Sequence, residues 1–325
     1  MVLILYRMEA TFALLSVRQN LNLLGNKVRT RYQEQAITTA QAAVELTRQQ
    51  LQKSVSQAYV AAYVTNKRMK VYAIIDSIYR NFEHAAKVKY DAMEISYLEY
   101  LTAKKKSRQI VEDKLQATDD YYTAVLQLSQ WLGSGFYEPT TAPEEYLTVV
   151  HSDSLIGTTL TKLYAEKVRL ADEGITLEKS KSLPTFFVES GTKMVGNRAG
   201  YWSIGAGISI PLFKKTYQAR ERAARLERDI AQANYETVEM TTQAAKRVSE
   251  AQYNKLQRKL VYYQKTALPT AREQQKGAAA AYQLGATDYV GFIQTMGDAV
   301  QTELDYWTAY EQLLLTQIDL KYPNI

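Results

Sequence analysis

The chain reads Tyr90-Asp-Ala-Met-Glu-Ile-Ser-Tyr-Leu-Glu-Tyr100 at the best candidate for a point where a long helix folds back on itself. The surrounding segment, residues 26 to 130, contains neither Gly nor Pro and is far longer than a normal globular helix. Ser96 precedes Glu99 by three residues, which is the pattern of a capping box at the start of a new helix. We therefore predict a hairpin whose first helix runs from about residue 26 to 92 and is roughly 100 Å long.

Both predicted helices carry apolar and small residues at three- and four-residue steps, as helices that pack side by side require. The composition also favours a mainly α protein, because 46% of the residues are hydrophobic and only 14 Gly and 6 Pro interrupt them. The same seams fit a soluble coiled coil equally well. The rest of the chain must therefore distinguish the two architectures.

The hairpin pattern occurs a second time, 192 residues later, in the stretch Tyr282-Gln-Leu-Gly-Ala-Thr-Asp-Tyr-Val-Gly-Phe292. Asp288 takes the capping place of Ser96 in this alignment. Gly285 aligns with Met93, so the first turn lacks the glycine that relieves a tight bend. We predict a second helical hairpin with its turn at this point.

A strand with two different faces precedes the second hairpin at Trp202-Ser-Ile-Gly-Ala-Gly-Ile-Ser-Ile210. At an offset of 191 residues, Leu15, Val17, Leu21 and Leu23 keep the same apolar phase. Such alternation is typical of a transmembrane barrel strand beside a wet lumen, and also of a strand in a soluble sandwich. The barrel is favoured because very long helices follow. The predicted lipid-facing side chains are Trp202, Ile204, Ala206, Ile208 and Ile210.

Three further segments complete the predicted organisation. A third strand begins at Pro184 with Phe186 and Val188 on one face, and residues 191 to 200 form a polar hairpin loop back to the Trp202 strand. A helix over residues 152 to 182 precedes that strand. The Gly, Pro and Thr-rich stretch from residue 133 to 143 predicts a connector packed outside the helices. The predicted domains are residues 1–133 (a first repeat with one strand and a hairpin), 134–150 (the connector) and 151–325 (a second repeat with a helix, a β-hairpin and a helical hairpin).

The residues that carry chemistry in enzymes are sparse. There is no Cys, and His84 and His151 lie 67 residues apart without the spacing of a metal pair. No phosphate-binding loop or nucleophile motif is present. We therefore predict no catalytic residue, no metal site, no cofactor and no enzymatic activity.

The charge distribution argues against a nucleic-acid partner. The net charge is +6 and the isoelectric point about 9.1, but the basic residues are interleaved with 34 acidic ones. Residues 104 to 106 form the only dense basic run and are best explained as a solvated helix face. No apolar stretch approaches the roughly 18 to 20 residues of a spanning helix, so any membrane passage is made by strands.

Several passages together resemble one known family, the TolC-like outer membrane efflux proteins, and particularly their heavy-metal efflux branch in Bacteroidota. The resemblance covers nearly the whole chain from about residue 12. It is carried by Ser182-Leu-Pro-Thr185, Gly207-Ile-Ser-Ile-Pro-Leu-Phe213, Ala219-Arg-Glu-Arg-Ala-Ala224, the turn from Tyr282 to Phe292, and Gln301-Thr-Glu-Leu-Asp-Tyr306.

The resemblance implies a homotrimer in which each subunit gives four strands to a shared β-barrel and long helical hairpins to a periplasmic α-barrel. It implies an outer-membrane location, contact with outer-membrane lipid, and a tripartite system with a periplasmic adaptor and an inner-membrane pump of the resistance-nodulation-division type. Only three strands are recognisable in the sequence. Since Met1-Val-Leu-Ile-Leu-Tyr6 lacks a basic leader and a cleavage site, we expect the N-terminal part, with the first strand, to be missing.

The function that follows is passive conduction of exported solutes, among which heavy-metal cations and drugs are candidates. A type I protein secretion conduit and a coiled-coil interaction protein without a channel remain alternatives. The predicted gate and adaptor contact lie at the two turns, where Asp288 serves either as a ring of charge or as a helix cap. The candidate residues are Tyr90, Met93, Glu94 and Ser96 in the first turn and Tyr282, Gly285, Thr287 and Asp288 in the second.

Overall fold

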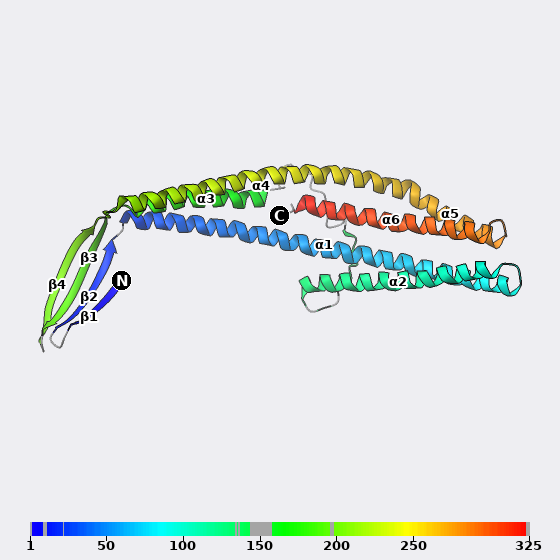
Figure 1. Ribbon diagram of the computed structural model, residues 1–325, viewed down its shortest axis with the longest axis horizontal. Coiled ribbons are helices and arrows are strands. Elements are labelled where there is room, and N and C mark those ends of the chain that lie inside the picture. Colours follow the sequence, from blue (N-terminus) through cyan, green and yellow to red (C-terminus); the bar gives the residue numbers. More distant parts are fainter. Residues whose placement is uncertain are drawn as a thin grey trace. The chain divides into compact units, whose positions relative to one another are not determined.

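The computed structural model describes residues 2–8, 12–21, 23–133, 135, 137–143, 158–195 and 198–322 (Figure 1). The chain divides into two compact units, Met1–Leu46 with Thr158–Thr241 and Thr47–Gly157 with Thr242–Ile325. Each unit draws on both halves of the sequence. The predicted domains therefore describe a repeat along the chain, and that division remains a prediction.

From residue 12 onward, strands and helices follow one another in the order that the sequence indicates, with long helices after short strands. Their bounds are β1 Val2–Met8, β2 Phe12–Leu21, α1 Leu23–Asp91, α2 Tyr97–Leu132, α3 Thr158–Ser180, β3 Thr185–Val195, β4 Arg198–Ser209, α4 Lys214–Tyr262, the π-helix η2 Tyr263–Ala267, α5 Leu268–Gln283 and α6 Tyr289–Lys321.

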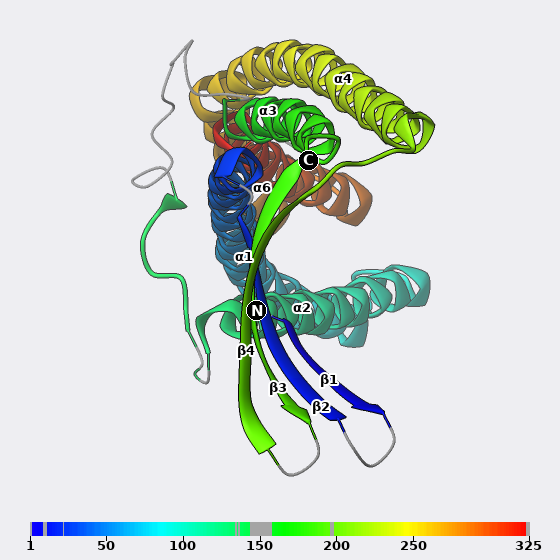
Figure 2. The ribbon, with the colours of Figure 1, turned by 90° about the vertical axis from the view of Figure 1, so that its left-hand side faces the viewer.

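One antiparallel sheet of four strands, in the order β1-β2-β3-β4, belongs to the first unit (Figure 2). The prediction of only three strands is wrong, because Val2–Met8 pairs with β2, with Leu3 opposite Val17. Residues 2 to 6 are apolar at every position, so they show no period of two. Only the pairing with β2 reveals them as a strand.

Two smaller predictions about the strands also need correction. Residues 191 to 200 are mostly strand rather than loop, since β3 continues to Val195 and β4 begins at Arg198. Gly191 lies in the ladder opposite Ser16 and Ser203, where neighbouring strands supply the hydrogen bonds that a loop would lack. Leu23 begins α1 instead of ending β2. The predicted helix from residue 152 is observed from Thr158, and residues 152–157 lie outside the described part.

The second unit contains two helical hairpins, as predicted. In Figure 1, α2 runs back along α1, and α6 runs back along α5. One core of buried residues joins them, in which Val71, Tyr79 and Phe82 of α1 pack with Tyr289 and Phe292 of α6. None of the helices among the described residues is both long and apolar enough to cross a membrane.

The π-helix η2 explains why the repeat changes its offset. Leu23 and Lys214, the first residues of α1 and α4, are 191 residues apart, whereas Met93 and Gly285 in the turns are 192 apart. A π-turn closes over five residues rather than four and so takes up one extra residue; the Leu268 N–H donates to the Tyr263 carbonyl. Pro269, which has no N–H to give, follows directly.

The first prediction concerns the shared core of the two hairpins. Phe82→Ala removes a buried ring and should lower the free energy of unfolding of this unit by about 3–5 kcal/mol. The exposed neighbour His84, changed to Ala, is the control and should stay within about 0.5 kcal/mol of wild type. Denaturant unfolding followed by circular dichroism measures both. Equal stability of the two variants would contradict the assigned core.

Candidate functional site at the hairpin turns

The two turns of the second unit have the same backbone conformation. In the first, the Glu94 N–H donates to the Lys89 carbonyl (2.8 Å) and the Met93 N–H to the Tyr90 carbonyl (2.9 Å). In the second, the corresponding donors are Ala286 to Ala281 (2.8 Å) and Gly285 to Tyr282 (3.2 Å). This pair of bonds is a Schellman motif, which satisfies the last carbonyls of α1 and α5.

Each Schellman motif needs one residue in the left-handed region, and the two turns fill this position differently. Gly285 has a φ of 69° and Met93 a φ of 64°. Glycine adopts this conformation without penalty, whereas a residue with a side chain is strained there. Because of this strain the Met93 backbone costs more than the Gly285 backbone, although the hydrogen bonds match.

The returning helices begin with the predicted caps. The Glu99 N–H donates to Ser96 Oγ (3.2 Å), and the Ser96 N–H donates to Glu99 Oε2 (2.7 Å), so the capping box is complete. The Gly291 N–H donates to Asp288 Oδ1 (2.8 Å). The Asp288 side chain is exposed, so its charge is directed to water while it caps α6.

Exposure separates the predicted turn residues into three groups. Met93 is 94% exposed, and Glu94, Ser96, Gly285 and Asp288 are also at the surface. Tyr90 and Thr287 are half-buried, and the Tyr90 ring packs against Tyr97 and Tyr100. Tyr282 is buried. It belongs to the core beneath the turns.

This core is an aromatic cluster that holds the two hairpins together. The Phe82 ring centroid lies 5.0 Å from that of Tyr282, 5.2 Å from Tyr289 and 4.4 Å from Phe292. Lys89 Nζ lies 4.5 Å from the Tyr282 ring centre, which adds a cation–π contact between α1 and α5. Phe82, Lys89 and Tyr289 were not among the residues predicted for this site. Tyr79, Phe82 and Ala86 are three and four residues apart, and this spacing indicates the buried face of α1.

Burial reinforces the protonated state of the phenols in this cluster. Desolvation raises the pKa of Tyr79 to about 12 and also raises the pKa values of Tyr282 and Tyr289. All three hydroxyl oxygens are buried and have no hydrogen-bond partner among the described residues. They therefore stay protonated at neutral pH and offer no phenolate for catalysis or metal binding.

A buried carboxylate links α1 to α2 farther from the turns. Asp76 Oδ1 accepts from Arg80 Nε (2.7 Å), and Asp76 Oδ2 accepts from Lys114 Nζ (2.7 Å). The Arg80 hydrogen bond, more than any other interaction, lowers the pKa of Asp76, and the Lys114 bond acts in the same direction. Lys114 makes the link between the two helices, and Arg80, on the same helix as Asp76, holds the carboxylate in place.

The sheet of the first unit has one apolar and one mixed face. Trp202, Ile204 and Ile208 of β4 are 76%, 69% and 49% exposed, and Val17 and Val188 on neighbouring strands share their face. On the other face, Arg18 Nε donates to Glu189 (2.7 Å) and the Arg18 guanidinium lies 4.2 Å from the centre of the Phe187 ring.

Gly207 leaves room on the mixed face for the Phe187 ring, because a Cβ there would lie 2.5 Å from Phe187 Cζ and the ring would have to move. The predicted alternation of small and apolar residues in β4 is thus observed.

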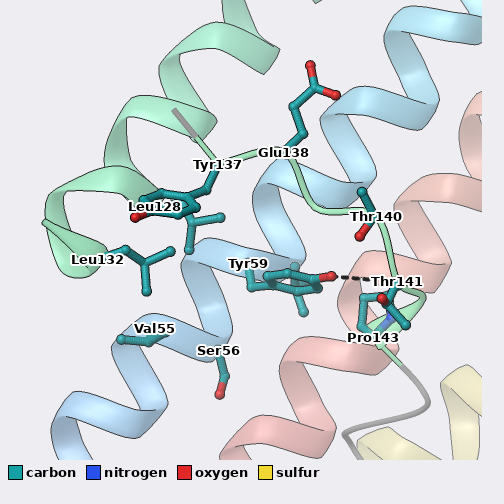
Figure 3. A pocket seen from close by; sticks show the side chains of 11 residues that line it. Val55, Ser56, Tyr59, Leu128, Leu132, Tyr137, Glu138, Thr140, Thr141 and Pro143 are labelled. Carbon is teal, nitrogen blue, oxygen red and sulfur yellow. Dashed lines mark hydrogen bonds between the residues drawn. The ribbon is translucent and has the colours of Figure 1, made fainter. Parts of the chain in front are cut away.

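A recess lies where the connector crosses α1 and α2 in the second unit (Figure 3). Its volume is about 410 Å³, and the connector is held over it by the Tyr59 hydroxyl, which donates to the Thr141 carbonyl (2.8 Å). Leu128, Leu132 and Tyr137 form the opposite wall. Among the described residues of the lining, Glu138 is the only acidic or basic one, so they include no acid–base pair. Connector residues 144–150 lie outside the described part.

Among the described residues, no group of three or more His, Cys, Asp and Glu side chains is arranged to hold a metal ion. His84 is exposed, and His151 lies outside the described residues. What the geometry offers is a pair of matched, solvent-facing turns and a sheet with an exposed apolar face.

The sequence and the fold were compared with those of known proteins. Residues 164–322 match a family described as outer membrane efflux protein. No curated protein matches the sequence.

Among solved structures, CusC shares 17% identity with a TM-score of 0.83, over 95% of this chain and 76% of its own. A membrane protein from Pseudomonas aeruginosa shares 18% identity with a TM-score of 0.84, covering 95% and 75%. The Campylobacter jejuni CmeC outer membrane channel shares 12% identity with a TM-score of 0.81, covering 95% and 70%. At these identities the structures show a shared fold.

The second prediction concerns the strained turn. Met93→Gly should stabilise the first turn locally by about 0.5–1 kcal/mol, since relief of the left-handed strain outweighs the added flexibility of the unfolded chain. Gly285→Ala should destabilise the second turn by a similar amount. Hydrogen exchange at the amides of Glu94 and Ala286, which close the two motifs, measures the effects. Faster exchange at Glu94 in Met93→Gly would show that the Met93 side chain stabilises the turn.

Proposed function

We propose that this chain, whose residues 164–322 match the outer membrane efflux protein family, is the outer-membrane channel subunit of a tripartite efflux system. One observation carries the proposal. A single antiparallel sheet with an exposed apolar face continues directly into long helical hairpins that end in matched turns. The proposed activity is passive conduction of solutes without chemistry.

The sheet supports a homotrimer. Its outer strands, β1 and β4, each have only one strand neighbour in the sheet. An unpaired strand edge is unfavourable in lipid, where no water replaces the lost hydrogen bonds. Pairing β4 of one subunit with β1 of the next satisfies both edges, and three copies then close a barrel of twelve strands.

The orientation of the sheet follows from its two faces. Ile204, Ala206 and Ile208 face outer-membrane lipid, together with Trp202, and Ser203 and Gly205 face water in the lumen. The helical hairpins extend into the periplasm. Exported solutes, such as heavy-metal cations or drugs, pass through the shared lumen.

The turns are the proposed gate and the contact with a periplasmic adaptor, which connects the channel to an inner-membrane pump. Each turn exposes one large apolar side chain: Met93 in the first turn is 94% exposed, and Leu284 in the second turn, one position earlier in the alignment, is 84% exposed. A partner protein can bury both side chains. Three copies of the exposed Asp288 carboxylate would form a ring that attracts cations.

The third prediction separates the two roles of Asp288. Asp288→Ala should cost about 0.5–2 kcal/mol of local stability, because it removes the acceptor for the Gly291 N–H, and should increase leakage through the channel. Asp288→Asn keeps the cap and removes the charge, so it should change cation selectivity at normal stability. Conductance in planar bilayers and hydrogen exchange at Gly291 are the measurements. Wild-type conductance in both variants would eliminate this turn as the gate.

The fourth prediction tests the lipid face. Ile204→Arg, in the middle of β4, places a charge in the bilayer and should cost about 2–4 kcal/mol of insertion free energy near the midplane. Ser203→Arg, one residue away on the opposite face, is the matched control and should insert normally. Outer-membrane fractionation of heat-modifiable trimers measures insertion. Equal insertion of both variants would remove the barrel assignment.

A further inference from the structure

The link between β4 and α4 exposes an unusually apolar sequence. Ile210, Leu212 and Phe213 are 57%, 81% and 80% exposed, although the segment is fixed to the start of the helix. The Lys214 N–H donates to the Leu212 carbonyl (3.2 Å), and the Thr216 N–H donates to the Phe213 carbonyl (3.3 Å). These side chains continue beyond Ile208, at the end of the apolar face of the sheet. Water is an unfavourable neighbour for them.

Basic residues follow the link immediately. Lys214, Lys215, Arg220 and Arg222 are exposed in the first turns of α4, and none of them forms an ion pair with a described residue. The carboxylate nearest to them in sequence, Glu221, is bound to Arg225 (2.8 Å).

The corresponding junction of the first repeat is similar. Lys27 and Arg29 are exposed at the start of α1, and Arg29 matches Arg220 at the offset of 191 residues. The first turns of α1 and α4 contain no acidic residue. Because the N-terminus of a helix favours negative side chains, lysines there do not stabilise α4. Their position calls for an anionic partner.

We propose that this junction, formed by Leu212, Phe213, Lys214 and Lys215 and extended by Arg220 and Arg222, binds acidic phospholipids of the leaflet that faces the helices. The inference rests on the proposed function, which places the neighbouring sheet in the outer membrane. Leu212 and Phe213 enter the acyl boundary, and the basic side chains contact headgroup phosphates.

Distances along the helix agree with this partner. Arg222 lies eight residues after Lys214, or about 12 Å along the axis. That is about one and a half Debye lengths at physiological salt, so Lys214 and Lys215 interact most strongly with a charged membrane surface, and the attraction weakens toward Arg222. A soluble phosphate would use the lysines but leave the apolar pair in water. The combination of apolar and basic residues therefore favours a lipid.

The test uses full-length trimers purified in detergent and native mass spectrometry. Phosphatidylglycerol and phosphatidylcholine with identical acyl chains are added separately. Wild type should retain more phosphatidylglycerol. The double variant Lys214→Gln with Lys215→Gln should bind phosphatidylglycerol roughly 30-fold more weakly, given the usual contribution of two lysines at a membrane surface. Its phosphatidylcholine binding should not change.

The matched control is Lys104→Gln with Lys105→Gln, a pair of adjacent exposed lysines on α2, which should bind phosphatidylglycerol like wild type. Three results would overturn the proposal: equal retention of both lipids by wild type, equal loss in the two double variants, or displacement of phosphatidylglycerol by inorganic phosphate at equal concentration. Leu212→Ser with Phe213→Ser should lower retention of both lipids, and unchanged retention would exclude the apolar contact.

Conductance of the same preparations separates this inference from the proposed function. Normal channels in bilayers together with equal retention of the two lipids would reject the lipid site alone. Wild-type trimers that form no channel in any bilayer would reject the proposed function.

Discussion

Long helices pack side by side only if their apolar faces stay aligned from end to end, and this constraint governs the second unit. A residue inserted into a helix rotates everything beyond it by about 100°. The second long helical run has one residue more than the first between its start and its turn. The π-helix at Tyr263–Ala267 absorbs that residue. Tyr282 then reaches Phe82, and the Schellman motifs of both turns form with the same pattern of hydrogen bonds.

Local signals predicted the features that depend on neighbours in sequence. The absence of Gly and Pro indicated α1 and α2, and the Ser96–Glu99 spacing indicated the capping box. Features that depend on distant residues were missed. Residues 2–6 are apolar without alternation, so only the pairing of Val2–Met8 with β2 identifies it as a strand. Residues 191–195 and 198–200 are strand because neighbouring strands hold them. Tyr282 looked like a surface residue of a turn, yet contacts from α1 and α6 bury it.

The sheet has two faces of different polarity, formed by alternate residues of the same strands. Alternation places Ile204 and Ser203 on opposite faces. Arg18, which would be costly against lipid, lies on the mixed face and is satisfied there by Glu189 and the Phe187 ring. That arrangement leaves the apolar face free of charge along Val17, Val188 and Ile208. The outward position of this face in the proposed barrel therefore follows from where the charges are satisfied.

The two turns satisfy the same hydrogen bonds at different local cost, and this asymmetry bears on function. Met93 is strained at φ 64°, and its apolar side chain is 94% exposed. In the single chain, therefore, neither the Met93 backbone conformation nor its side chain stabilises the fold. Gly285 gives the same backbone turn without strain, although Leu284 beside it is also 84% exposed. Natural proteins depart from local rules chiefly at functional sites, where another interaction offsets the strain. Methionine adapts its shape to a partner surface. A contact that buries Met93 would offset both costs, and for that reason the first turn is the stronger candidate for adaptor binding, whereas the second has the charge suited to a gate.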